Sequence, residues 1–490
     1  MTVNATLSRV RTDQFSFLDA QHLLNRAGFG GTPAQIRALV DMGIDKAVDY
    51  LVDYTDIDKS GLEIPQYDSD LVGPATPEQR RVFREARQTG DQQLLARVRQ
   101  MRARQRQQDR MQMSDLTRWW IARMITTPRP LEEKLVLLWH GHFATQYQKV
   151  RDSYLMLKQN ALFRKHASGN FAQLAVAIVR DPAMLRFLDN TQNNRRKPNE
   201  NLARELMELF TLGEGNYTEH DIRQGARALT GYGVQDNEFV FRRRQHDDGV
   251  KTILGRRGAF DGDGFARILI AHRACARFVA YKLYKFFVCD LPDDQMPWLT
   301  GVVNRLAGEV VRHKYELRPV LKRLFKSQHF FDSAIAGNMI KSPVQLVIGA
   351  MRTMQTPSRD LSVIDDAMGS MGQRLFNPPS VAGWPGGRAW VTTSAYYTRQ
   401  NLCTYLITGK MPIGRRQKDQ MQFDPTALIA GLPGNSPDVV VDHLMQSLLG
   451  RQILPGRRKA LVELMRGEIT RDRLTAALLL ITAMPEYQLM

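Results

Sequence analysis

Apolar residues recur at helical spacing along almost the whole chain of 490 residues. Such spacing places them on one face of each helix, and that face must be buried against other helices. Local signals divide the pattern: Thr32-Pro33 predicts the start of a helix, and Thr89-Gly90 predicts a break between two helices. The sequence therefore predicts a mainly α protein, built as one large multi-helix domain.

One short stretch departs from the helical spacing. Residues 238–242 and 250–254 are rich in Val, Ile and Phe, as strands are, and they flank Asp247-Asp248-Gly249, a sequence typical of a tight turn. We therefore expect these two segments to pair as one small β-hairpin.

The domain organisation follows from where the helical pattern is dense and where it loosens. We expect residues 1–410 to form the main helical domain, with a basic helical segment near residues 77–124. The pattern loosens after residue 411 and then resumes. Residues 411–490 are therefore predicted to be a C-terminal helical extension packed on the main domain.

The net charge of +18 favours a polyanionic partner, whether a nucleic acid, an anionic polysaccharide or a membrane surface. Residues 80–110 hold ten arginines against Glu85, Asp91 and Asp109, a local balance of 10 − 3 = +7. This segment is either a solvated helix face or a groove for a polyanion, and the first interpretation is the more common one. No aromatic residues alternate with the arginines, as a single-strand stacking surface would require.

The segment 199–213 predicts a helix with two unlike faces. Asn199 is expected at its N-cap and Gly213 at its left-handed C-cap. Its polar face carries Arg204 among carboxylates that include Glu205 and Glu208. Clustered carboxylates can divide into a proton donor and a proton acceptor, but carboxylates around an arginine can equally be a structural network.

Two histidine motifs are further candidates for chemistry. His140 and His142 are separated by one residue, so they could share a metal ion on an extended segment, whereas on a helix they diverge by about 160°. The alternative is two histidines packed at a helix terminus. His246 belongs to a polar cluster with Lys251 next to the predicted turn, and turn chemistry alone does not require a histidine there.

Several classes of protein are excluded or disfavoured by the sequence. Motifs of zincins, α/β-hydrolases, phosphate-binding loops and paired Cys-x-x-Cys zinc modules are absent. The three cysteines are widely spaced and odd in number, so we expect them to be buried apolar groups. The N-terminus lacks a secretory leader and no run is long enough for a membrane span, so the cytoplasm is the default location.

Ordered motifs along most of the chain make the protein resemble the large bacterial family of domain of unknown function 1800. The match begins near residue 20 and continues to the end of the chain. The motifs that carry the resemblance are His22 to Gly30, Trp139 to Phe143, Asn199 to Gly213, Arg227 to Gly231, His246 to Gly255, Lys341 to Val344, Pro378 to Gly387 and Pro485 to Gln488.

Two positions depart from the family pattern. Gly141 stands where members usually have Asn, and Tyr232 stands where they usually have Trp. Genes of the family often lie beside genes for a second family that resembles sulfatases and often carries twin-arginine leaders. The resemblance therefore implies a sulfatase-like partner protein and allows export with it, but it implies no activity.

Our leading functional hypothesis is a hydrolase-like, metal-assisted enzyme that acts on an anionic substrate. In it His140 and His142 bind a divalent metal such as Zn, Mn or Fe, and Glu205, Glu208 and His246 are catalytic. Arg204, Lys251 and Trp384 bind the substrate. One alternative is a non-catalytic accessory protein for the sulfatase-like partner, and another is a nucleic-acid-binding protein, based only on the arginine count.

Overall fold

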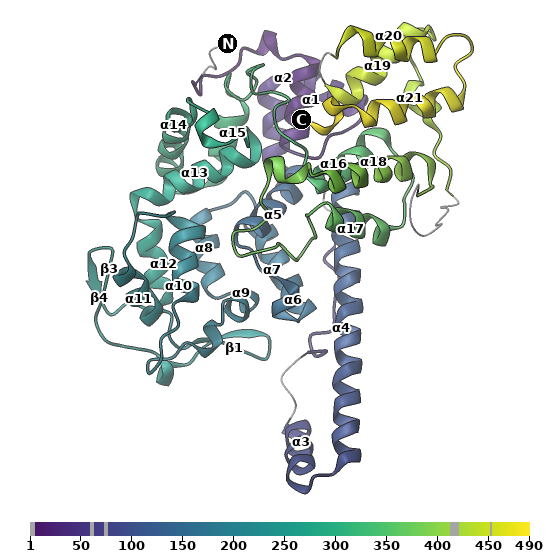
Figure 1. The fold of residues 1–490 in the computed structure, drawn as a ribbon. Helices are drawn as coiled ribbons and strands as arrows, with labels where there is room; N and C mark the ends of the chain where they lie inside the picture. Colours follow the sequence, from purple (N-terminus) through teal and green to yellow (C-terminus); the bar gives the residue numbers. More distant parts are fainter. Residues whose placement is uncertain (1–4, 59–62, 73–76, 412–420, 451–452) are drawn as a thin grey trace.

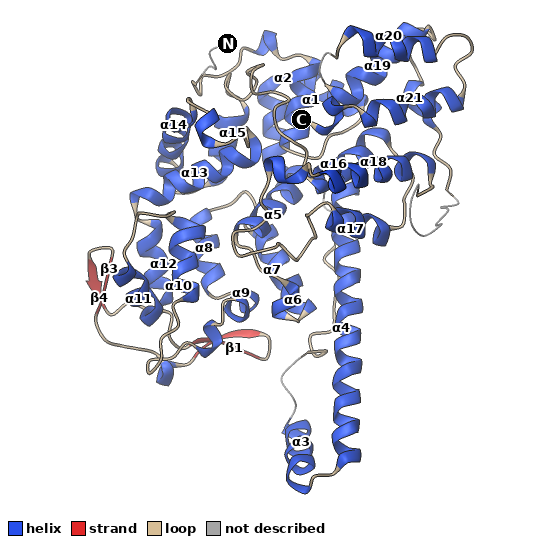
Figure 2. Cartoon of the chain, in the orientation of Figure 1, coloured by secondary structure: helices blue, strands red, loops and turns tan. Residues whose placement is uncertain are grey.

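The computed structural model describes residues 5–58, 63–72, 77–411, 421–450 and 453–490. Over these residues the chain forms 21 α-helices and two antiparallel sheets of two strands each (Figure 2). Most helices gather into one body, and α4 projects from it as a long arm with α3 near its tip (Figure 1). The predicted mainly α class is therefore confirmed.

The N-terminal helices begin and end where local chemistry places them. Ser16 caps α1 (Phe17–Arg26) and Thr32 caps α2 (Pro33–Val52), each in a capping box closed by the side chain three positions on. α3 (Pro77–Thr89) and α4 (Gln92–Thr126) are separated at Gly90, whose φ is +68°. Both the helix start at Thr32 and the break after Thr89 are as predicted.

The remaining helices follow in chain order, with the two strand pairs between α11 and α12. They are α5 (Pro130–His142), α6 (Tyr147–Val150), α7 (Ser153–Lys165), α8 (Phe171–Val179), α9 (Pro182–Phe187), α10 (Asn201–Glu205), α11 (Glu219–Ala228), α12 (Gly262–Ile270), α13 (Arg273–Phe287), α14 (Leu299–Arg312), α15 (Leu317–Phe325), α16 (Pro343–Met354), α17 (Leu361–Ser370), α18 (Thr393–Thr408), α19 (Pro437–Leu449), α20 (Pro455–Leu464) and α21 (Arg471–Ala483). Short 3-10 turns lie at Thr12–Gln14, Tyr54–Asp56, Asn190–Gln192, Arg243–Gln245, Asp293–Gln295, Gly387–Trp390, Pro425–Ile429 and Pro485–Gln488.

The strands pair differently from the predicted hairpin. β1 (Tyr232–Gln235) pairs with β2 (Glu238–Phe241), and β3 (Lys251–Ile253) pairs with β4 (Arg256–Gly258). Asp236 and Asn237 both have positive φ, which suits the tight turn between β1 and β2. Asp247-Asp248-Gly249 is not the turn of a hairpin, and the expectation that residues 238–242 pair with 250–254 is wrong.

The segment after α10 continues as a π-helix, η4 (Leu206–Thr211), rather than as one regular α-helix. Of the four residues on its apolar face, Leu202, Leu206 and Phe210 are buried and Leu209 is half-buried. Gly213 has the expected positive φ of 77°. A π-helical turn shifts the residues that follow it relative to an α-helix. The expected N-cap Asn199 is wrong, because Glu200 occupies that position and its side chain forms no capping hydrogen bond. The local sequence signals therefore predict the C-terminal end of this element but neither its N-cap nor its winding.

One apolar core runs through the body, and it includes residues of the C-terminal helices α19 and α21. The three cysteines are buried and unpaired, as expected. The division of the chain near residue 410 stays a prediction. Among the described residues no helix has the length and apolar character needed to cross a membrane.

Between α4, α5 and α7 the core holds a charged cluster around Glu133. The carboxylate of Glu133 accepts hydrogen bonds from Trp120 (2.9 Å), from Arg164 (2.7 and 2.8 Å) and from Arg123. The Glu133 side chain is fully buried. Burial alone would raise its pKa, but Arg164 and Arg123 outweigh that effect and lower it to about 2.

Candidate anion-binding pocket

A pocket of about 430 Å³ lies between α5, α13 and the segment 382–390. Its volume is within the range of small-molecule sites. Apolar and aromatic side chains form much of its wall, and four charged groups join them. The lining residues are Lys134, Leu137, Leu138, Gly141, His142, Tyr281, Lys282, Lys285, Phe286, Asp290, Met339, Ile340, Ser342, Gln373, Ala382, Trp384, Pro385, Gly386, Trp390 and Met490.

Two glycines let the segment 382–390 lie directly on the end of α5. A Cβ added to Gly383, where φ is +87°, would lie only 2.1 Å from the carbonyl oxygen of Gly141. A Cβ added to Gly141 would lie 3.3 Å from the ring of Trp384. The absence of a side chain at these two positions therefore allows Trp384 to form part of the pocket wall.

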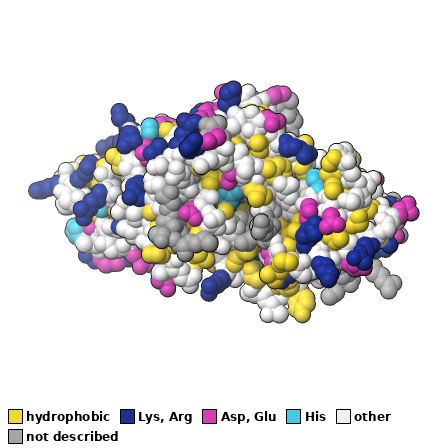
Figure 3. Space-filling model, turned by 90° about the horizontal axis from the view of Figure 1, so that it is seen from above, with side chains coloured by type: hydrophobic (Ala, Val, Ile, Leu, Met, Phe, Trp, Pro, Cys, Tyr) yellow, Lys and Arg dark blue, Asp and Glu magenta, His cyan; other side chains and the backbone are white. Residues whose placement is uncertain are grey.

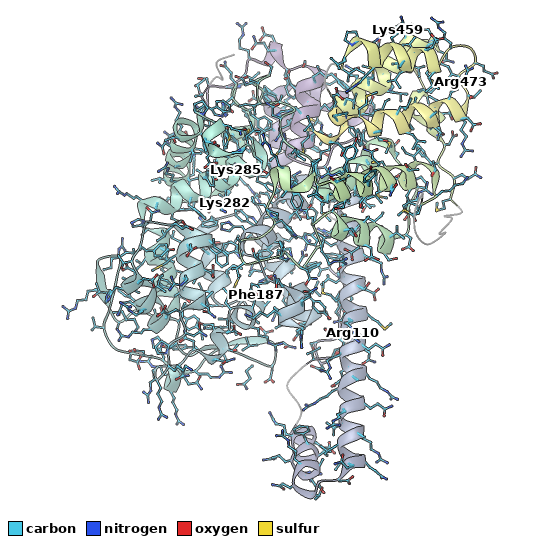
Figure 4. The ribbon with its side chains drawn as sticks, viewed as in Figure 1. Arg110, Phe187, Lys282, Lys285, Lys459 and Arg473 are labelled. Atoms are coloured by element: carbon cyan, nitrogen blue, oxygen red, sulfur yellow. The ribbon has the colours of Figure 1, made fainter. Side chains whose placement is uncertain are left out.

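α13 contributes two lysines one turn apart, Lys282 and Lys285 (Figure 4). The Lys285 ammonium donates to the carbonyl of Leu291 (2.5 Å) and to Asp293 (3.3 Å), and lies 3.7 Å from Asp290. Over the described residues Lys282 has no ion pair with a carboxylate, and its ammonium lies 5.1 Å from the ring centroid of Phe278. Burial, and next the Lys285 ammonium, lower the pKa of Lys282.

α5 contributes a third lysine, Lys134, which is 3% exposed. Its ammonium donates to the amide oxygen of Gln345 and lies 5.1 Å from the ring centroid of Phe29 and 5.7 Å from that of Phe286. Burial, and next the guanidinium of Arg26, hold the pKa of Lys134 well below its usual value. Desolvated cations without carboxylate partners attract an anion strongly.

Asp290 is the one acidic side chain of the pocket wall among the described residues. Burial raises its pKa, against the opposing attraction of Lys285. A Cβ added to Gly386, where φ is +73°, would lie 2.8 Å from an Asp290 carboxylate oxygen, so this glycine allows close approach. With three lysines to one aspartate, the wall carries an excess of positive charge when the lysines are protonated.

Two polar atoms of the pocket residues lack hydrogen-bond partners in the described part of the chain. His142 Nε2 lies 3.0 Å from the carbonyl oxygen of Phe210 in η4, so it carries the proton, and Nδ1 is left as an unpartnered acceptor. The Nε1 donor of Trp384 is also buried and unpartnered. Burial, and next Lys282, lower the pKa of His142 to about 3. The imidazole is therefore neutral at pH 7.

His140 and His142 both lie on the last turn of α5, and their rings point into different surroundings. His140 contacts Trp120, Phe163, Phe376 and Trp384, whereas His142 contacts Trp139, Phe143, Phe171, Phe210 and Phe278. Burial lowers the pKa of His140 to about 3. The described residues contain no group of three or more His, Cys, Asp or Glu side chains placed to hold a metal. The binding of one metal ion by the two histidines stays a prediction.

Arg204, Glu205 and Glu208 lie on α10 and η4, where their side chains are half-buried. Arg204 donates two hydrogen bonds to Glu219 (2.7 and 2.8 Å) and one to Glu200 (3.3 Å), while Glu208 accepts one from Tyr217 (3.0 Å). Burial, and next Glu208, raise the pKa of Glu205. This network links α10 to α11, and none of the three residues lines the pocket.

His246 and Lys251 form part of a third cluster, which fastens the loop 242–250 to α11. His246 Nδ1 lies 2.8 Å from the carbonyl oxygen of Thr230, and the Lys251 ammonium donates to the carbonyls of Asp247 (2.5 Å) and Gly249 (3.1 Å). Arg227 holds Asp247 with two hydrogen bonds of 2.7 and 3.1 Å. The side chains of Lys251 and His246 form hydrogen bonds with main-chain carbonyls, and these bonds explain why both side chains are buried.

Of the eight site residues predicted from the sequence, the pocket contains His142 and Trp384. The sequence reasoning missed Lys134, Lys282 and Lys285. A usable signal was present, because Lys134 directly precedes the apolar run from Leu135 to Trp139, and Lys282 and Lys285 share one face of a helix rich in aromatic residues. Charged residues at such positions are rarely buried without a purpose.

The fold and the pocket together define a class: a mainly α protein with a lysine-lined cavity in its body. The chain belongs to the family described as "Protein of unknown function (DUF1800)", whose model matches residues 22–489. The family resemblance read from the sequence motifs is thereby confirmed. No curated protein and no solved structure matches the chain.

Proposed function

We propose that the protein binds a small anionic molecule with an apolar part in the lysine-lined pocket. The observation that carries the proposal is Lys282, a half-buried lysine that lines the pocket together with Lys134 and Lys285 and has no carboxylate partner among the described residues. An anion would offset the repulsion between the Lys282 and Lys285 ammonium groups, and the wall of Trp384, Trp390 and Phe286 suits an apolar or aromatic group.

A hydrolytic enzyme acting on such an anion is the second candidate, and one observation favours it. His142 is neutral and has an unpartnered Nδ1 in the wall that also holds Lys282. In this proposal Lys282 and Lys285 hold the anionic group and His142 accepts a proton from the attacking water, while the negative charge of the substrate raises the pKa of the imidazole. No step is assigned to a metal, because His140 and His142 point apart.

Binding is tested by thermal unfolding of the full chain with phosphate, sulfate, benzoate and phenyl phosphate as probes. At ten times its dissociation constant, a ligand stabilises the folded state by about 1.4 kcal/mol. We expect at least one probe to raise the melting temperature of the wild type, and Lys282→Met to abolish that increase. Lys282→Met without ligand should be at least as stable as the wild type, because it removes a desolvated charge.

Lys459→Met is the matched control, since Lys459 is exposed on α20, far from the pocket (Figure 4). It should leave the ligand-induced increase unchanged. The proposal fails if none of the four probes stabilises the wild type, or if Lys282→Met responds to them as the wild type does. A non-catalytic accessory protein for a sulfatase-like partner predicts that failure, because it needs no small-anion site.

A further inference from the structure

The arm formed by α3 and the first half of α4 carries the strongest local charge of the chain. Ten arginines lie between residues 80 and 110, all with exposed side chains, and the segment 77–126 holds no lysine. Seen from above, the body instead shows Lys and Arg side chains scattered among acidic and apolar ones (Figure 3). The charge of the arm is therefore a local feature and not part of a uniformly basic surface.

The few acidic groups of the arm do not neutralise its arginines. Asp91 caps α4 by accepting from the amides of Gln93 (2.9 Å) and Leu94 (3.0 Å). Asp109 is buried at the base of the arm, where it accepts from Tyr147 (2.7 Å) and from the amide of Ser153 (2.7 Å). Within the described residues no arginine from 80 to 110 forms an ion pair with a carboxylate.

α3 covers one side of the arm's long helix. The buried or half-buried positions Leu94, Val98 and Gln105 face it, and Arg102 lies over the ring of Phe83 of α3, 4.5 Å from its centroid. At 100° per residue, the opposite side of α4 is a ridge of small and amide side chains. This outer ridge consists of Gln93, Ala96, Gln100, Ala103 and Gln107, all exposed.

Arginines border the outer ridge on both sides. Arg99, Arg106 and Arg110 lie along one border and Arg97 and Arg104 along the other, by the same helical spacing. A flat anionic surface would contact one border at most. A groove with a row of phosphates on each side contacts both borders at once, and the small ridge between them allows the helix to approach the floor of the groove.

We propose that the arm binds double-stranded DNA, with the outer ridge of α4 in the major groove. That groove admits an α-helix, arginine pairs with phosphates through its planar fork, and glutamine can hydrogen-bond adenine edges. The deep, narrow major groove of duplex RNA does not admit a helix in this way. A membrane is disfavoured by the tip of the arm, which is polar at Thr89, Gly90 and Asp91.

The proposal is tested by fluorescence anisotropy of the full chain with a labelled duplex of about 24 base pairs at several salt concentrations. We expect binding that weakens steeply with salt. The triple variant Arg99→Gln, Arg106→Gln, Arg110→Gln should weaken binding at least tenfold and reduce the salt slope by about 2 to 3. The control triple variant Arg244→Gln, Arg256→Gln, Arg257→Gln loses the same charge from exposed sites outside the arm. It should bind within about twofold of the wild type.

A second pair of variants tests the placement of α4. Ala103→Glu and Gln88→Glu add the same negative charge to the arm, on the outer ridge and on α3 respectively. Entry of the ridge into the groove predicts a loss of affinity at least tenfold larger for Ala103→Glu. Circular dichroism of both variants checks that the arm remains helical.

Four results overturn the proposal. They are an absence of DNA binding at low salt, equal losses in the two triple variants, equal losses in Ala103→Glu and Gln88→Glu, and binding to phosphatidylglycerol vesicles or duplex RNA as tight as to DNA.

Discussion

Three histidines show how burial controls charge at single positions of this protein. His22, His140 and His142 are all buried, and burial lowers the pKa of each to about 3. In the unfolded chain each would titrate near its ordinary value of 6.5. The folded state therefore keeps these rings neutral at pH values where the unfolded chain binds a proton at each of them.

The consequence is a loss of stability in acid. Above pH 6.5 both states are neutral at these positions; as the pH falls from 6.5 towards 3, only the unfolded state gains protons, so the free energy of unfolding decreases. By pH 5 each histidine accounts for a decrease of about 2 kcal/mol relative to pH 7.5. Denaturant titrations at the two pH values measure this difference.

The variant His140→Phe should remove one such contribution, since a phenyl ring suits the aromatic surroundings and does not titrate. Its loss of stability between pH 7.5 and pH 5 should be smaller than that of the wild type by about 2 kcal/mol. His220→Gln, at an exposed position of α11, should leave the loss unchanged. An identical pH dependence for His140→Phe and the wild type would contradict the prediction.

Single residues also show the limit of prediction from sequence. Thr32, Gly90 and Gly213 were assigned correctly, because capping and positive φ depend on near neighbours in the chain. The lysines of the pocket were missed, because Lys134 and Lys282 are about 150 residues apart and meet only when α5 packs near α13. The roles assigned to Glu205, Glu208 and His246 stay predictions.

At the scale of elements, the Glu133 cluster joins three helices through one carboxylate. Glu133 on α5 accepts from Trp120 and Arg123 on α4 and from Arg164 on α7. Glu133→Gln would leave the buried Arg164 guanidinium without its counter-charge, while Arg123 keeps its ion pair with Glu132 at 3.1 Å. The expected cost is about 3 to 5 kcal/mol in the free energy of unfolding. Chemical denaturation measures the loss.

Glu238→Gln provides the comparison. Glu238 pairs with Lys158 at the surface, where its side chain is 70% exposed, so its loss should cost no more than about 1 kcal/mol. Similar losses for the two variants would show that the Glu133 cluster does not hold the helices together.

The sequence predicts which segments form helices and strands, but not which strands pair with each other. Helices follow from apolar spacing within one segment, and their ends follow from local caps. β2 pairs across the turn Asp236-Asn237, which directly precedes it, whereas Asp247-Asp248-Gly249 lies six residues beyond its end. The π-helical winding of η4 likewise leaves no periodic signal in the sequence.

At the scale of the whole molecule, the arm and the body are separate in their contacts. α3 packs on α4, while the second half of α4 packs with α16 and α17 in the body. Replacing residues 77–106 by a short Gly-Ser linker keeps Asp109 and its hydrogen bonds to Tyr147 and Ser153. It should therefore leave the melting temperature of the body within about 4 °C of the wild type. A larger decrease in a thermal scan would show that the arm supports the core.

The length of the arm has a kinetic consequence. From Gln92 to Arg110 the helix extends about 28 Å, nearly three times the distance of about 10 Å over which 0.1 M salt screens a charge. A polyanion approaching the tip therefore experiences the arginines without the carboxylates of the body. This local field would accelerate encounters of a polyanion with the tip even if the protein as a whole were made neutral. The association rate would therefore follow the charge of the arm rather than the net charge of the chain.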